Sequence, residues 1–156
     1  MNDTRHIRWI VLPIALTSLL GGPTAVADVV TDWNVTAADM TVAAGLGPPP
    51  ANRTLAMVQT AVYEAVNAIT KRYPPDRATP NASPDASVAA AVAAANRAML
   101  SRLMPSQQPA IDKAYAGALA AIADGPAKTA GIAVGEQAAT AVLAWRADEP
   151  APDDDD

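Results

Sequence analysis

The segment AKTAGIAVGEQAATAVLAWRA, residues 127–147, indicates which kind of fold this chain forms. Gly131, Gly135 and Ala139 recur at steps of four, so on a helix they form one ridge of small side chains. In a membrane such a ridge is typical of a dimerisation face. Four charged or amide side chains interrupt the segment: Lys128, Glu136, Gln137 and Arg146. We therefore expect this helix to pack closely against another helix inside a soluble bundle.

Four more helices are expected upstream of this segment. Apolar spacing, caps and breakers predict five helices over about residues 32–44, 51–72, 84–104, 107–124 and 127–147. In the second helix one stripe follows steps of three and four: Leu55, Val58, Val62, Ala65 and Ile69. Ser83 and Ser106 are the expected N-caps of the third and fourth helices. The three prolines at 48–50 are expected to end the first helix.

Composition supports an all-α fold. Alanine makes up about a quarter of the chain and phenylalanine is absent. Alanine is the best helix former, and its small side chain lets helix axes approach closely. Strand signals are weak, because Val, Ile and Thr are scattered along the chain and do not alternate with polar residues. The short links favour a compact array of about five antiparallel helices.

The N-terminus has the pattern of an export signal. A basic start at Arg5 to Arg8 precedes an apolar stretch from Trp9 to Leu20, and the triplet Ala25-Val26-Ala27 fits signal peptidase. We expect residues 1–27 to be removed and the chain to be secreted or periplasmic. The alternative is an uncleaved anchor. No stable membrane span is expected, since the apolar stretch is shorter than the ~20 residues that crossing a bilayer requires.

The remaining chain is expected to form one helical domain over residues 28–148, followed by a disordered acidic tail over residues 149–156. Without residues 1–27 it carries nine basic and fifteen acidic residues, a net charge of −6. This charge disfavours nucleic acid and anionic lipid as partners.

Little catalytic chemistry is available to the exported chain. Cysteine is absent, and the only histidine, His6, lies in the segment expected to be removed. The usual general base, transition-metal ligands and thiolate nucleophile are therefore missing. Three acids on the expected helices are the candidates for a carboxylate metal site, and none has an accompanying histidine: Glu64, Asp112 and Glu136. We interpret Glu64 as a structural acid, paired with Arg97 or Arg102 on the third helix.

Four stretches in order carry a family resemblance. They are 28–34 (DVVTDWN), 43–49 (AAGLGPP), 53–69 (RTLAMVQTAVYEAVNAI) and 124–133 (DGPAKTAGIA). Together they resemble the N-terminal helical region of secreted bacterial proteins related to vanadium-dependent haloperoxidases. Those proteins belong with the acid phosphatases of the PAP2 (phosphatidic acid phosphatase type 2) superfamily. The resemblance covers the chain from about residue 28 to residue 148.

The resemblance implies a helical protein whose chemistry lies in a second bundle. There, a lysine and two arginines bind vanadate or phosphate, a Ser-Gly-His motif supplies an acid/base histidine, and a second histidine binds vanadium or attacks phosphorus. This sequence contains none of these motifs, and Arg53, Arg97 and Arg102 do not match the oxyanion clamp. No catalytic, cofactor-binding or metal residue is therefore assigned, and vanadate is expected only in the related enzymes.

Two functions remain open. The chain is expected to be the N-terminal domain of such a protein, truncated before the vanadate or phosphate site and inactive alone. Its partner would then be a separately encoded catalytic half or a second copy. The alternative is a stand-alone secreted helical scaffold or interaction module without enzyme activity. The family comprises haloperoxidases and acid phosphatases, but this chain lacks the catalytic histidines and the oxyanion-binding motifs, so its sequence leaves enzyme activity undecided.

Overall fold

Helix α3 (Val88–Leu103) lies at the centre of the structure and contacts each of the other four α-helices. The structure is a computed structural model that describes residues 24–75 and 80–147. Its other elements are α1 (Thr24–Ala43), α2 (Pro48–Thr70), the 3₁₀ turn η1 (Pro105–Gln107), α4 (Gln108–Ala120) and α5 (Pro126–Ala147). Most of the expected signal segment and the expected acidic tail lie outside the described residues.

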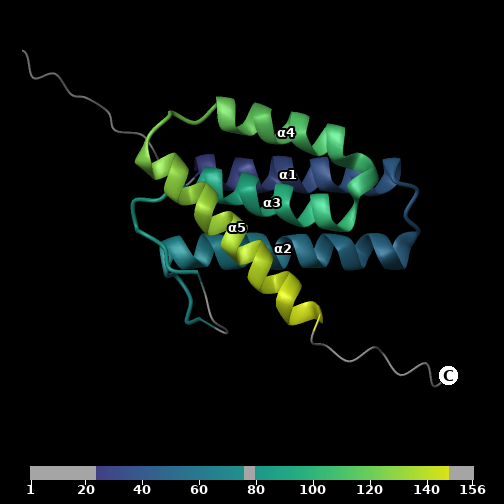
Figure 1. The fold of residues 1–156 in the computed structure, drawn as a ribbon, viewed down its shortest axis with the longest axis horizontal. Helices are drawn as coiled ribbons and strands as arrows, with labels where there is room; N and C mark the ends of the chain where they lie inside the picture. The colour runs from purple at the N-terminus through teal and green to yellow at the C-terminus, as the bar shows by residue number, and fades with distance from the viewer. Residues whose placement is uncertain (1–23, 76–79, 148–156) are drawn as a thin grey trace, which may run out of the picture.

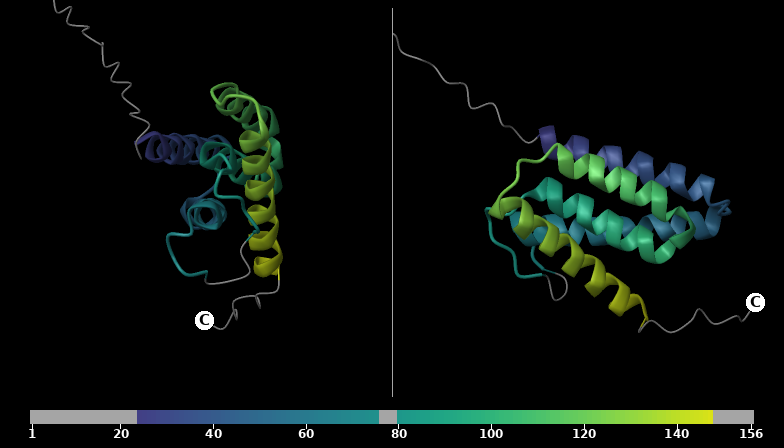
Figure 2. Two further views of the ribbon diagram at one scale, coloured as in Figure 1. Left: turned by 90° about the vertical axis from the view of Figure 1, so that its left-hand side faces the viewer. Right: turned by 45° about the horizontal axis from the view of Figure 1, so that its top comes forward.

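The first four α-helices run alternately up and down, and α5 crosses them obliquely (Figure 1). Helices α2 and α3 lie side by side, and α5 lies across both. Seen along the bundle, α1 and α5 lie on opposite sides of α3 (Figure 2). All regular structure in the described ranges is helical, which confirms the all-α prediction.

Burial on every side explains the composition of α3. Seven consecutive residues, from Ala90 to Asn96, are buried. A helix in contact with neighbours all round must be apolar all round, and small side chains allow those neighbours to come close. Ser87 begins the helix, since its hydroxyl oxygen accepts a hydrogen bond of 3.2 Å from the Ala90 N–H.

The closest helix contact joins α3 to α5 through the predicted small-residue ridge. Gly131, Gly135 and Ala139 are all buried. A Cβ atom at Gly131 would overlap the Ser87 carbonyl oxygen, and one at Gly135 would overlap the Ala91 carbonyl oxygen. Glycine at these two positions therefore lets the backbones of α3 and α5 touch, as the sequence predicted.

The largest errors of the sequence prediction concern where helices begin. Helix α1 begins at Thr24, not near residue 32, because Val29 and Val30 already pack against the core. Helix α2 begins at Pro48, so the three prolines start this helix and do not merely end the one before. Proline is accepted in a first turn because its missing N–H has no partner there.

Both predicted serine caps were wrong. Ser83 closes a separate turn in which its carbonyl oxygen accepts from the Ala86 N–H at 3.1 Å, and α3 begins only after Ser87. The Ser87 N–H donates to the Ala127 carbonyl oxygen at 2.9 Å, so the start of α3 is fixed against the start of α5. Ser106 lies inside η1, and α4 begins after it.

None of the helices in the described residues is both long and apolar enough to cross a membrane. This holds for α5, whose small-residue ridge packs on α3.

We predict that Gly131→Ala and Gly135→Ala each lower the free energy of unfolding by about 1–3 kcal/mol or more, because the added methyl group forces α3 and α5 apart. The matched control is Gly117→Ala in α4, where a new Cβ meets no atom within 4 Å. That change should raise stability by roughly 0.5–1 kcal/mol through helix propensity. Urea unfolding followed by circular dichroism measures all three. Equal effects at the three positions would contradict the close contact.

Candidate functional site

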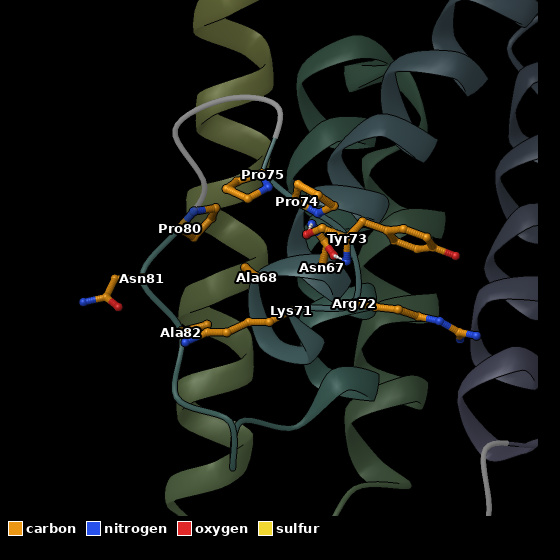
Figure 3. A pocket seen from close by; sticks show the side chains of 10 residues that line it. All are labelled: Asn67, Ala68, Lys71, Arg72, Tyr73, Pro74, Pro75, Pro80, Asn81 and Ala82. Atoms are coloured by element: carbon orange, nitrogen blue, oxygen red, sulfur yellow. Dashed lines mark hydrogen bonds between the residues drawn. The ribbon is translucent and has the colours of Figure 1, made fainter.

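A hollow with a volume of about 700 Å³ lies at the C-terminal end of α2. Residues from the end of α2 and from the segment that follows it line the hollow: Asn67, Ala68, Lys71, Arg72, Tyr73, Pro74, Pro75, Pro80, Asn81 and Ala82 (Figure 3). It is the natural first place to look for a ligand site, because binding sites are usually the most concave part of a surface.

The wall of this hollow is held by Asn67. Its side-chain NH₂ donates to the Tyr73 carbonyl oxygen at 3.1 Å, and its side-chain oxygen accepts from the Tyr73 N–H at 2.9 Å. Lys71 ends the helix in the left-handed conformation, with φ of 49°, and its N–H donates to the Asn67 carbonyl oxygen. The Asn67 amide therefore uses one N–H donor and one acceptor site in turning the chain.

The remaining polar groups of the hollow do not converge. The Lys71 side chain extends towards Ala82, whereas Arg72 and Tyr73 extend to the opposite side and Asn81 points outward (Figure 3). Among the described lining residues there is no carboxylate, imidazole or thiol. A single ammonium group beside prolines and alanines can attract an anion, but it supplies no acid–base pair or nucleophile. These described residues therefore suggest no catalytic role for the hollow.

Glu64 differs from its predicted role. It is only 8 % exposed, yet its carboxylate has no hydrogen bond or ion pair with any described residue. Its oxygens are not among the fully buried atoms that lack partners, so they keep contact with solvent. The predicted pairing with Arg97 or Arg102 is wrong. A carboxylate at the edge of the core can be hydrated by water and then needs no partner from the protein.

Arg97 instead belongs to a polar cluster that joins α3 to α4. Its Nε lies 3.3 Å from an Asp112 carboxylate oxygen, and its guanidinium group lies 4.9 Å from the centre of the Tyr115 ring. The Gln108 side-chain NH₂ donates to the same Asp112 oxygen at 3.0 Å. That hydrogen bond first, and Arg97 second, hold the pKa of Asp112 below its usual value, while burial raises the pKa of Tyr115.

This cluster is structural in character. Asp112 is half-exposed, and its lowered pKa reflects charge-assisted hydrogen bonds at a helix contact. Arg53, Arg102 and Glu136 are exposed on α2, α3 and α5 respectively. Across the described ranges, no group of three or more acidic, histidine or cysteine side chains is placed to hold a metal ion.

Comparison with known proteins adds no assignment. No protein-family model matches the chain, and neither a curated protein nor a solved structure matches it. Functional arguments therefore depend on the residues and their geometry.

The sequence reasoning missed the hollow and its Asn67 clamp. Tyr73-Pro74-Pro75 did predict the end of α2, and Asn67 was noted one turn after Glu64. Nothing in the local pattern indicated that Asn67 would bond to the backbone of Tyr73, because that contact depends on how the chain turns after the helix.

Replacing Glu64 tests whether its carboxylate has a partner. We predict that Glu64→Gln changes the free energy of unfolding by less than about 1 kcal/mol, since no pair is broken, whereas breaking a buried ion pair costs about 3–5 kcal/mol. Asn67→Ala is the matched control on the same helix with similar burial. It should cost about 1–3 kcal/mol, because two backbone groups of Tyr73 lose their partner. Denaturant titration measures both, and a loss near 4 kcal/mol for Glu64→Gln would show a hidden partner.

Proposed function

We propose that this chain is the N-terminal helical domain of an exported protein related to vanadium haloperoxidases and PAP2 phosphatases. In this role it is a non-catalytic packing domain, and the vanadate or phosphate site belongs to a separate helical half. The observation that carries the proposal is the ordered resemblance of the four stretches within residues 28–148.

Two features of the fold agree with such a role. The chain is all-helical, as a half of a helical enzyme must be. The charged groups that do make contacts tie helices together: Arg97 joins α3 to α4, and Lys128 joins the end of α4 to the start of α5. Side chains committed to helix contacts are suited to a packing domain and not to turnover.

The residues of this chain do not fit vanadate. An oxyanion needs several cationic donors directed at one point. Arg97 is bound to Asp112 and stacked on Tyr115, while Arg53 and Arg102 are exposed on different helices. No histidine follows His6 in the sequence. The proposal therefore assigns no step of vanadate or phosphate chemistry to these residues.

A stand-alone scaffold is the second candidate, and one observation favours it. The described residues of all five α-helices share one continuous buried core, closed by the α3–α5 contact. A domain with its own core can fold without a partner. Under this second proposal the chain binds another protein and does not associate with a catalytic half.

The purified chain is expected to show no bromide or chloride peroxidation with vanadate and hydrogen peroxide, and no hydrolysis of a phosphate monoester. The physical reason is that neither an oxyanion clamp nor an acid/base histidine is present in its exported part. Rates should equal those of free vanadate or buffer. Turnover that follows the protein through purification, and that Glu64→Gln or Arg97→Met abolishes, would contradict the proposed function.

Cooperative unfolding separates the two candidates. A sharp transition in a monomer that binds no dye specific for exposed apolar surface favours the stand-alone scaffold. A dye-binding, loosely packed species favours an orphaned half of a larger protein.

A further inference from the structure

Helix α1 carries a regular stripe of exposed residues. Asp32, Val35, Asp39 and Val42 follow one another at steps of three, four and three, and all four are exposed. Val42 is 78 % exposed and Val35 is 58 % exposed, the highest values among large apolar side chains of the described chain. We refer to these four residues as the α1 stripe.

The α1 stripe lies opposite the residues that anchor the helix. Trp33, Ala37 and Met40 are buried in the core. At about 100° per residue, the middle of the stripe lies roughly 150° around the helix from them. Asn34 accepts a hydrogen bond from the Gln59 side chain, which also ties α1 to α2. The stripe is therefore presented on a fixed helix and is exposed along its length, with Asp32 at the edge of a hollow that α1 forms with α3 and α4.

Steps of three and four are the spacing with which one helix lies along another. Two valines supply the apolar contacts of such a seam. Two aspartates alternate with them, and neither carboxylate forms an ion pair with a described residue. Helix α1 contains no lysine or arginine at all. A partner must therefore bring its own positive charges.

We infer that the α1 stripe is a docking face for an amphipathic helix of a partner protein, with aliphatic side chains and Lys or Arg residues alternating at the same spacing. The aliphatic side chains cover Val35 and Val42, and the cations pair with Asp32 and Asp39. This inference rests on the proposed role as a packing domain and names the surface through which it packs.

The negative charge of the α1 stripe distinguishes between the possible binding partners. A second copy would bring two more aspartates to the seam, and like charges across a helix interface are unfavourable. An anionic lipid surface is repelled for the same reason. A basic helix satisfies both the valines and the aspartates. The seam spans about 15 Å from Asp32 to Val42, so it supports a weak and reversible contact unless the partner extends beyond it.

The test uses designed helical peptides and the full chain. One peptide carries Leu and Lys at alternating steps of three and four, a second carries Glu in place of Lys, and a third carries Ser in place of Leu. Backbone amide shifts of the protein locate binding and give its affinity. The Lys peptide should shift residues of α1 and bind at least ten-fold more tightly than the other two.

Charge reversal supplies the decisive variant. Asp39→Lys should weaken the Lys peptide at least five-fold and make the Glu peptide the tighter ligand. Glu136→Lys, an exposed acid on α5, is the matched control and should leave both affinities unchanged. Val42→Ser should weaken the Lys peptide without reversing the preference. Because all three changes are at exposed positions, they leave the core intact.

Several results would overturn the inference: no shift on α1 at millimolar peptide, equal binding of the Lys and Glu peptides, or an Asp39→Lys variant that binds like the original. A concentration-dependent dimer that Val42→Ser abolishes would show that a second copy covers the stripe instead. Halogenation or phosphatase turnover by the chain alone would overturn the proposed function without changing the peptide result. The two failures are therefore distinguishable.

Discussion

Backbone contact between α3 and α5 is the constraint on which the rest of this structure depends. Gly131 and Gly135 leave no room for a side chain against Ser87 and Ala91, so the two helices approach as closely as their main chains allow. At such a distance many weak dispersion contacts form over a short length of helix, and they replace the large side chains that this chain lacks. The absence of phenylalanine and the abundance of alanine are consequences of the same packing.

Once α5 lies on one side of α3, polar contacts at helix ends fix the other elements. The Lys128 ammonium group donates to the carbonyl oxygens of Leu119 and Ile122, at 2.7 and 3.2 Å, and to Asp124 at 2.8 Å. It therefore binds carbonyls where α4 ends, groups that the helix itself cannot pair. In the sequence Lys128 only argued against a membrane helix. In the structure it ties the end of α4 to the start of α5.

The spacing of apolar and small residues predicted which helix residues are buried, but it did not predict where helices begin after the chain changes direction. The small-residue ridge on α5 and most of the α2 stripe are buried as expected, because spacing along a helix fixes which residues share a face. Helix starts were less predictable. Ser83 and Ser87 are both acceptable caps, and the choice depends on the hydrogen bond from the Ser87 N–H to Ala127, forty residues away. The same holds for Glu64: local sequence marks it as a buried acid, but the position of Arg97 against Asp112 decides that it has no partner.

Paired and unpaired charged side chains lie on different parts of the domain. Within the described residues, Arg97 and Lys128 each pair with an acid at a helix contact, while Asp32, Asp39 and Glu64 have no ion pair. These two cations hold helices together, and the carboxylates of Asp32 and Asp39 stay exposed on α1. Local negative charge of this kind favours encounters with basic partners over acidic ones. The α1 stripe therefore selects a partner through the carboxylates that the fold leaves unpaired.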